Sequence, residues 1–264
     1  MTPKALLIDL DGVLYTGKKP IPGAKEAISY LDDSGISYRF VSNTTRKSRR
    51  SIVRHLNQLG LDISGDLVFT PPRAAVQYLK NAGTSRISLL TTADAGSEFS
   101  EEGFCITDDS PDFVVIGDAG DGFSYESLND AFRMVIAGAG IIALEKDRYW
   151  MGDDGLLLSA GPFVAALEYA TGKVATIMGK PSPAFFLAAL ESMAVSPDEA
   201  AMIGDDVVTD IGGAISAGLS GVLVRTGKFR EDALAAANPS PDLVIGSIAD
   251  IPGVIHELDR TDTT

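Results

Sequence analysis

The sequence predicts an α/β protein with a Rossmann-like core, built on a parallel sheet, and an inserted α/β domain. Short unbroken apolar runs, such as Ala5 to Ile8 and Gly221 to Val224, are typical of strands buried on both faces of a parallel sheet. Helical patterns separate these runs, as in repeated β-α-β units. The 264 residues suffice for one large core or for a core with an inserted domain.

Composition and net charge exclude several classes of partner. The formal net charge of −14 disfavours a nucleic-acid groove and binding to an anionic membrane surface. The longest apolar run, Met134 to Leu144, is too short to span a bilayer, and Asp9 cuts the first apolar run, so we expect no signal peptide. The single cysteine, Cys105, is expected in the core, and the absence of an internal disulfide fits a cytoplasmic location.

The first strand ends in paired carboxylates. Asp9 and Asp11 follow Ala5 to Ile8 directly, and Gly12 permits a sharp exit. Open parallel sheets bind their ligands at the carboxyl ends of strands. Two carboxylates so close together repel each other unless they share a cation or a proton. A bound Mg²⁺, the usual metal for hard oxygen ligands, is one interpretation, and a solvated acidic turn is the alternative.

A second strand, Tyr38 to Val41, follows a helical pattern that opens at Pro22-Gly23 and stops at Gly35. The segment Ser42 to Arg46 comes next. Its hydroxyl and amide groups are neutral donors of the kind that hold phosphate oxygens, although the same residue types also cap helices. The rest of this part is expected to hold a helix ending at Gly60, a short apolar segment at 67–69 and a helix from Pro71 to about Lys80.

A new α/β unit begins near Ala82. Strands are expected at 86–91, 112–117 and 140–144, and helices at 125–138 and 163–171. We therefore expect an inserted cap domain over 82–176 and a catalytic core formed by 1–81 and 177–264. The run Gly138 to Ala143 matches a dinucleotide-binding pattern, but it leaves a helix and enters a strand, the reverse of what that pattern requires. The acidic segment Gly117 to Asp121 is interpreted as a strand-end turn.

The last third of the chain brings a second acidic strand end. Gly179-Lys180 precedes a helix and is followed by proline, so it is no P-loop. Ala201 to Gly204 forms a strand that ends in three more carboxylates, Asp205, Asp206 and Asp210. Further strands are expected at 221–224 and 243–245. Three carboxylates at a second buried strand end are unlike ordinary surface charge.

Four segments thus end in polar residues in a fixed order: D-x-D, S-N, a lone lysine and G-D-D-x-x-x-D. This order resembles the haloacid dehalogenase superfamily, and its phosphatases rather than its dehalogenases, which lack the second aspartate of the first motif. The position of the insertion resembles the NagD-like subgroup, which carries a large α/β cap. The resemblance extends to Arg148-Tyr149, Gly161-Pro162-Phe163, Ala166 to Thr171 and Thr226-Gly227-Lys228.

The resemblance implies a Mg²⁺-dependent phosphatase acting on a small phosphorylated metabolite. It implies that Asp9 attacks phosphorus and forms an aspartyl phosphate, while Asp11 acts as general acid and then as general base. The implied metal ligands are the Asp9 carboxylate, the Asp11 backbone carbonyl and the Asp205 carboxylate.

Further residues are implied to support this chemistry. Ser42, Asn43 and Lys180 would hold the remaining phosphate oxygens, where charge must be stabilised during phosphoryl transfer. Asp206 and Asp210 are expected to orient Lys180, the metal waters and the Ser42 loop rather than to ligate directly.

Substrate choice is expected to depend on the cap. In related caps the loop that aligns with Glu145 to Tyr149 approaches the catalytic motifs. Lys146 and Arg148 are candidates for contact with an anionic leaving group, and Tyr149 or Trp150 for stacking on a ring; cap packing or a homodimer contact is the alternative. Relatives of the sugar-phosphate type carry Asn-Pro-Asp where this chain has Glu-Lys-Asp, so a nucleotide-sugar substrate is not transferred from them. The sequence also leaves open whether P–N or P–O–P bonds are cleaved as well as P–O–C bonds.

Other functions remain to be tested against this one. A metal-independent dehalogenase also uses an Asp nucleophile, but Asp11 and Asp205 argue against it. A phosphate-sensing receiver domain combines similar groups in about half this length and without a cap. An inactive scaffold would not need every catalytic position. Neither His55 nor His256 lies in a motif, and a Ser-His-Asp hydrolase is disfavoured because G-x-S-x-G is absent.

Overall fold

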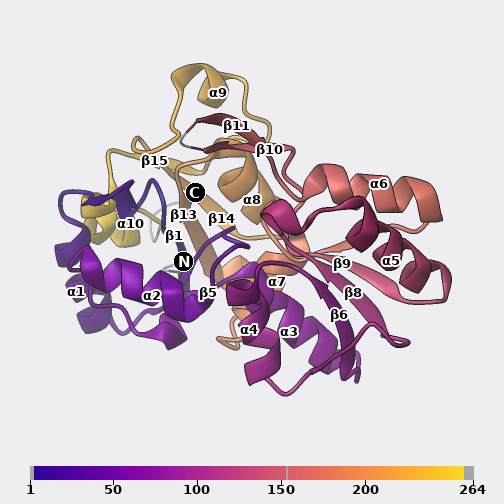
Figure 1. The fold of residues 1–264 in the computed structure, drawn as a ribbon. Coiled ribbons are helices and arrows are strands. Elements are labelled where there is room, and N and C mark those ends of the chain that lie inside the picture. The colour runs from indigo at the N-terminus through magenta and orange to yellow at the C-terminus, as the bar shows by residue number, and fades with distance from the viewer. Residues whose placement is uncertain (1–2, 153, 259–264) are drawn as a thin grey trace. The chain divides into compact units, whose positions relative to one another are not determined.

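A computed structural model describes residues 3–152 and 154–258, in which two compact units can be distinguished (Figure 1). Unit 1 comprises Met1–Ser42, Val53–Phe69 and Lys180–Thr264, and unit 2 comprises Asn43–Ile52 and Thr70–Gly179. Each unit contains its own parallel sheet with flanking helices, so the predicted α/β fold class is confirmed. The assignment of 82–176 as a cap domain stays a prediction.

The sheet of unit 1 is six-stranded and parallel throughout. Its order is β15 (Leu243–Ile245), β14 (Ser220–Val224), β13 (Ala200–Gly204), β1 (Ala5–Asp9), β4 (Ser37–Val41) and β5 (Val68–Phe69). All residues of β1 and β13 are buried, as their apolar sequences predict. The chain runs from β1 to β4 and β5 on one side and later returns to β13 on the other side, which is the arrangement that creates a ligand-binding crevice.

Helices and turns connect these strands. They are α1 (Ala24–Ser34), α7 (Pro183–Glu191), α8 (Gly213–Ser216), α9 (Glu231–Ala235), α10 (Ile251–Leu258), the short turns η1 (Gly65–Leu67), η3 (Pro197–Glu199) and η5 (Ile248–Asp250), and a π-helical turn η4 (Val207–Gly212). A small hairpin, β2 (Tyr15–Thr16) with β3 (Lys19–Pro20), follows β1. Helix α2 (Arg49–Gln58) begins among residues of unit 2 and ends among those of unit 1.

The sheet of unit 2 is five-stranded and parallel. Its order is β12 (Thr176–Ile177), β9 (Gly140–Ala143), β8 (Phe113–Ile116), β6 (Arg86–Leu90) and β7 (Cys105–Ile106). Its helices are α3 (Pro71–Asn81), α4 (Ala93–Glu101), α5 (Tyr125–Ile136), α6 (Gly161–Thr171) and the turn η2 (Gly120–Gly122). A separate antiparallel hairpin joins β10 (Tyr149–Gly152) to β11 (Gly155–Leu158).

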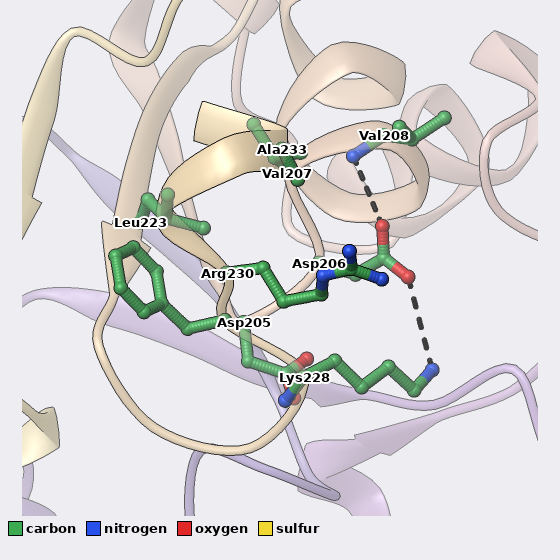
Figure 2. Close-up of a pocket in the computed structure, with 9 residues that line it drawn as sticks. Asp205, Asp206, Val207, Val208, Leu223, Lys228, Arg230 and Ala233 are labelled. Atoms are coloured by element: carbon green, nitrogen blue, oxygen red, sulfur yellow. Dashed lines mark hydrogen bonds and ion pairs between the residues drawn. The ribbon is translucent and has the colours of Figure 1, made fainter. Parts of the chain in front are cut away.

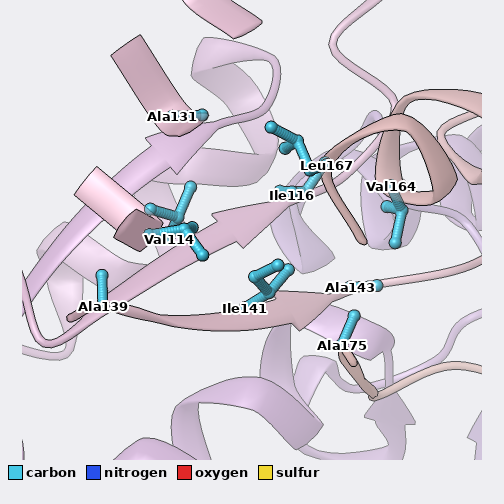
Figure 3. Close-up of a cluster of buried hydrophobic side chains, with 10 residues drawn as sticks. Val114, Ile116, Ala131, Ala139, Ile141, Ala143, Val164, Leu167 and Ala175 are labelled. Atoms are coloured by element: carbon cyan, nitrogen blue, oxygen red, sulfur yellow. The ribbon is translucent and has the colours of Figure 1, made fainter. Parts of the chain in front are cut away.

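A small apolar core holds α5 and α6 against the sheet of unit 2 (Figure 3). Val114 and Ile116 from β8 and Ile141 from β9 contribute sheet residues, and Val135 and Leu167 contribute helix residues. Phe123 and Phe163 stack near the starts of the two helices, with ring centroids 3.8 Å apart. Removing this surface from water stabilises the unit and fixes the strand ends that carry its polar residues.

Several sequence-based predictions differ from the structure. Helix α4 and the hairpin of β10 and β11 were not predicted, because neither has the apolar periodicity of a buried element. The expectation that Cys105 lies in the core is wrong: it is exposed, because β7 is an edge strand. Gly117 to Asp121 is a strand-end turn, as predicted. None of the helices described has the length and apolarity that crossing a membrane requires.

Candidate active site

Neighbouring strands of unit 1 bring three of the predicted residues to one edge of its sheet. Asp9 ends β1, Asp205 follows β13 and Ser42 follows β4, and these strands are adjacent in the order β13-β1-β4. The carboxylates of Asp9, Asp205 and Asp210 each offer an oxygen, and these oxygens all lie within 4.8 Å of one another. The sequence predicted Asp9 and Asp205 together, whereas Asp210 was expected only to support them.

Lys180 supplies positive charge inside this cluster. Its Nζ lies 2.5 Å from Asp9 Oδ1 and 2.7 Å from Asp210 Oδ1, and all three side chains are almost fully buried. The π-helical turn η4 carries Asp210 directly over Gly204. A Cβ at Gly204 would lie 2.3 Å from the Asp210 Cβ, so only glycine allows this approach. Asp210 thus contacts the lysine that the sequence predicted it to orient.

The cluster places three carboxyl groups around a single ammonium group, that of Lys180. Burial raises the pKa of Asp9, with further contributions from Asp210 and Asp205, while the Lys180 ammonium acts in the opposite direction. Burial also raises the pKa of Asp205 to about 6, opposed by a hydrogen bond from the Lys228 backbone. Three carboxylates close to a single ammonium leave room for a further cation. Hard oxygen donors so close together fit Mg²⁺.

Asp11 lies outside this carboxylate cluster and is exposed. Its backbone forms a bridge with Tyr15, and Gly12 turns the chain with a φ of +88°. The ring of Tyr15 packs edge-on against His55, at a centroid distance of 5.3 Å. Burial and the charges of Asp11 and Asp9 raise the pKa of the Tyr15 hydroxyl. The Asp11 carboxylate is thus open to solvent, unlike the three buried carboxylates of the cluster.

Asp206 points away from its neighbour Asp205 and stabilises the start of η4. Its Oδ1 accepts hydrogen bonds from the backbone N–H groups of Val208 and Thr209, both at 3.0 Å. Its Oδ2 lies 3.8 Å from the Nζ of Lys228 (Figure 2). A cavity of about 190 Å³ lies here, and its lining residues are Asp205, Asp206, Val207, Val208, Leu223, Lys228, Phe229, Arg230 and Ala233.

Two further contacts hold Asp205. The backbone N–H of Lys228 donates to Asp205 Oδ2 at 2.7 Å, and Gly12 and Gly227 both pack against the same oxygen. No role was predicted for this turn from the sequence. The sequence signals were the family resemblance of Thr226-Gly227-Lys228 and its place shortly after a buried strand.

The predicted phosphate-binding residues at the end of β4 are partly engaged by backbone and side-chain contacts. Ser42 is buried, and its backbone N–H donates to the carbonyl of Phe69 at 3.2 Å. Asn43, which falls in unit 2, donates from Nδ2 to Asp147 Oδ2 at 3.3 Å. The structure therefore joins Asn43 to the loop that the sequence singled out for substrate choice.

That loop of unit 2 is built around the buried carboxylate of Glu145. Glu145 accepts hydrogen bonds from Ser159 Oγ at 2.6 Å, from the Ala160 N–H at 2.7 Å and from the Asp147 N–H. Burial raises its pKa, and these bonds oppose that shift. A Cβ at Gly161 would lie 2.4 Å from the Asp147 carbonyl oxygen, so the loop also needs a glycine there.

The candidate specificity residues differ in their surroundings. Lys146 donates to Glu168 Oε2 at 2.6 Å on α6, so its charge is already paired within unit 2. Arg148 and Tyr149 are exposed. The face of Trp150 lies 5.6 Å from the Arg46 guanidinium carbon. Of the two basic residues, Arg148 is the more exposed, and Lys146 is paired with Glu168.

Comparison with known proteins places this geometry in context. A family model described as haloacid dehalogenase-like hydrolase matches residues 6–105, and one described as HAD-hydrolase-like matches residues 177–251. The human haloacid dehalogenase-like hydrolase domain-containing protein 2 is 43% identical over 92% of this chain and 92% of its own length. Human phospholysine phosphohistidine inorganic pyrophosphate phosphatase is 43% identical over 86% of this chain and 84% of its own.

Solved structures agree with these relatives. The 4-nitrophenylphosphatase of Thermotoga maritima superposes with a TM-score of 0.88 at 29% identity, covering 96% of this chain and 98% of its own. NagD from E. coli K-12 gives a TM-score of 0.87 at 27% identity, covering 95% and 98%. The similarity thus extends over nearly the whole chain, including the residues of both units.

Proposed function

Because this chain belongs to the haloacid dehalogenase-like hydrolase family, among its NagD-like phosphatases, we propose that it hydrolyses a small phosphorylated metabolite with Mg²⁺ through an aspartyl phosphate. The observation that carries this proposal is the buried group of Asp9, Asp205 and Asp210 beside the Lys180 ammonium. Such a group combines a nucleophile, oxygen ligands and a fixed positive charge, which phosphoryl transfer requires.

We assign the metal to the Asp9 and Asp205 carboxylates and to the backbone carbonyl of Asp11. Asp210 belongs to the same cluster, but its contact with Lys180 favours the role of orienting that lysine. Bound Mg²⁺ would supply positive charge to the phosphoryl oxygens. Asp206, which holds the start of η4, would keep Asp210 in place.

The reaction then follows from the residues of this chain. One Asp9 oxygen attacks phosphorus, and the bond between phosphorus and the leaving oxygen breaks. Asp11 gives its proton to that leaving oxygen, and next takes a proton from the water that attacks the aspartyl phosphate. This second displacement releases inorganic phosphate and restores both carboxyl groups. Lys180, Ser42 and Asn43 would hold the phosphate oxygens during both steps.

The substrate class remains broader than one compound. The name of one relative specifies phospholysine, phosphohistidine and inorganic pyrophosphate, so P–N and P–O–P bonds belong in the test beside phosphate monoesters. We assign the choice among them to a cap domain over 82–176, with Arg148 as its main charged contact and Lys146 and Tyr149 as further candidates. A panel of these three bond types with Mg²⁺ identifies the preferred class.

The test of the proposed function uses p-nitrophenyl phosphate. We expect hydrolysis that requires Mg²⁺, stops in EDTA and falls by at least about 10³-fold in Asp9→Asn, which keeps the shape of the side chain but removes the nucleophile. Circular dichroism and thermal unfolding of Asp9→Asn check that the fold is intact. Turnover by Asp9→Asn above a trace would contradict the covalent mechanism. Dehalogenation that persists in EDTA would instead support a metal-independent dehalogenase.

We further propose that the chain forms a homodimer through the hairpin of β10 and β11 and is located in the cytoplasm. Met151, Leu156 and Leu158 lie on one face of this hairpin, by its register, and all three are 61–70% exposed. Neighbouring exposed apolar side chains of this kind are typical of a protein contact. Light scattering should show a dimer, and Leu156→Glu should give monomers; an unchanged mass would exclude this face. The single cysteine fits a reducing compartment, and cell fractionation tests the location.

A further inference from the structure

The turn that follows β14 makes two hydrogen bonds to the candidate active site. Thr226 Oγ1 donates to the backbone carbonyl of Gly12 at 2.5 Å. The backbone N–H of Lys228 donates to Asp205 Oδ2 at 2.7 Å. The turn therefore joins the chain segment after β1 to the carboxylate after β13, and all these residues belong to unit 1.

The space around Asp205 Oδ2 is closed by two glycines. A Cβ at Gly12 would lie 1.8 Å from this oxygen, and a Cβ at Gly227 would lie 1.9 Å from it. A Cβ at Gly227 would also approach the Gly12 Cα to 2.5 Å. Both glycines have positive φ, +88° and +61°, a conformation that side-chain-bearing residues adopt only with strain. The two backbones thus enclose the oxygen and leave no room for a side chain.

We infer that the Thr226–Gly227–Lys228 turn is a positioning element for the Asp205 carboxylate as a metal ligand. Because Oδ2 accepts the Lys228 N–H and is enclosed by the two glycines, the carboxylate cannot rotate without losing that bond. Its orientation toward Asp9 and Asp210, with which it forms the cluster, is fixed before any cation binds. This inference rests on the proposed function, since it assigns Asp205 to the metal.

The backbone of Lys228, rather than its ammonium group, performs this role. The side chain is 70% exposed and its Nζ lies 3.8 Å from Asp206 Oδ2, at the cavity shown in Figure 2. An ammonium near an acidic cluster does not raise the affinity for a divalent cation, because like charges repel. Removing it should therefore leave the metal affinity intact, whereas disturbing the turn should not.

The experiment measures Mg²⁺ binding without substrate, by calorimetry and by the rise in melting temperature with Mg²⁺ concentration. Gly227→Ala should weaken binding about 10- to 100-fold, the range found when groups that orient metal ligands are removed. Gly35→Ala is the matched control: its φ is +73° in the same unit, but nothing lies within 4 Å of the added Cβ. It should share the strain of Gly227→Ala and keep the wild-type affinity.

Three further variants keep the test decisive if Gly227→Ala does not fold. Thr226→Val removes only the bond to Gly12 and should weaken Mg²⁺ binding, and Thr226→Ser should restore it. Lys228→Met keeps the backbone N–H and should not weaken binding. Wild-type affinity in Thr226→Val, or a loss in Lys228→Met as large as that of Thr226→Val, would overturn the inference.

The same measurement separates this inference from the proposed function. A wild-type chain that hydrolyses phosphate esters but binds no Mg²⁺ would overturn the metal assignment and the positioning role with it. If every turn variant bound Mg²⁺ as tightly as the wild-type chain, the proposed phosphatase function would stand and only the positioning role would be overturned.

Discussion

Both units end strands of a parallel sheet in buried acidic residues, yet only one of them gathers these residues into a cluster. In unit 1, Asp9 follows from β1 and Asp205 from β13, and their carboxylates converge with that of Asp210. In unit 2, Asp118 comes after β8 and Glu145 after β9, and these strands are also neighbours. Among the residues described, no metal-binding group includes either of them.

The difference lies in what compensates each charge. In unit 2 the carboxylates accept nearby neutral donors: Asp118 Oδ1 takes the Gly120 N–H at 3.0 Å, and Glu145 takes a hydroxyl and two N–H groups. In unit 1, Asp9 and Asp210 share one ammonium, that of Lys180. A carboxylate that is satisfied by neighbouring hydrogen-bond donors has a structural role, whereas carboxylates that converge on a shared cation form a candidate active site. Position at a strand end does not distinguish the two.

The largest effect is expected from Lys180→Met. Removing the ammonium leaves buried carboxylates without their partner, so the free energy of unfolding should fall by about 3–5 kcal/mol. Hydrolysis of p-nitrophenyl phosphate should fall at least about 10²-fold, because a donor to the phosphate is lost. Mg²⁺ should restore part of the stability, since a cation bound by the folded state compensates the same charge. Urea unfolding with and without Mg²⁺ measures this.

Lys4→Met is the control for that variant. Lys4 also pairs with a carboxylate of unit 1, that of Glu199, but on the exposed surface. We expect no measurable change in stability or activity, because exposed ion pairs contribute little. If Lys180→Met were as stable as Lys4→Met in EDTA, the shared lysine would not be what compensates the cluster.

The sequence predicts the role of an acidic residue only where the groups that it contacts lie close to it along the chain. The acidic strand ends of unit 1 were predictable, because an apolar run followed directly by carboxylates marks each of them. Glu145 was not recognised as a structural acid, because its donors Ser159 and Ala160 lie 14 and 15 residues away. Their approach depends on the hairpin of β10 and β11, which has no buried apolar stripe to predict it.

In the candidate active site, too, the sequence predicts which residues are present but not how their side chains are oriented. The order of the motifs predicted Asp9, Asp205 and Lys180, but side-chain direction after a strand is not a property of the sequence pattern. Asp206 and Asp210 are four residues apart, yet one turns outward to hold η4 and the other inward to Lys180. The π-helical turn η4 sets these two directions by bringing Asp210 close to Gly204. This contact between turn and strand is not visible in the sequence pattern.

Glu145→Ala should have the next largest effect, and on stability rather than on chemistry. It leaves the Ser159 hydroxyl and the Asp147 and Ala160 N–H groups without their acceptor, and we expect a loss of about 2–4 kcal/mol in unfolding free energy. Turnover of p-nitrophenyl phosphate should change less than about threefold, because a small generic ester draws little on this loop. Glu145→Gln, which keeps one acceptor oxygen, should lose less. Equal stability of Glu145→Ala and wild type would refute the structural role.

Arg148→Ala should reveal whether the exposed end of this loop recognises substrate. Losing one charge-assisted contact should lower kcat/KM for the best anionic substrate by about 1.5–3 kcal/mol, roughly ten- to a hundredfold. The loss for p-nitrophenyl phosphate should be much smaller. Arg133→Ala, on the exposed surface of α5, is the control for removing an arginine. Equal losses for both substrates would indicate packing or a dimer contact, and no loss for either would remove the loop from the site.

The smallest effect is expected from Asp118→Asn, which tests how much the charge of a structural carboxylate contributes to stability. The amide keeps an oxygen for the Gly120 N–H and loses only the charge that faces Arg46, whose Nη1 lies 3.8 Å away and whose side chain is 43% exposed. Because the two groups are 3.8 Å apart and water screens the Arg46 guanidinium, unfolding free energy should fall by less than about 1 kcal/mol, with Mg²⁺ binding unchanged. Asp118→Ala also removes the bond to Gly120 and should cost more. A loss in Asp118→Asn as large as that of Glu145→Ala would show that charge, and not local donors, governs the acids of unit 2.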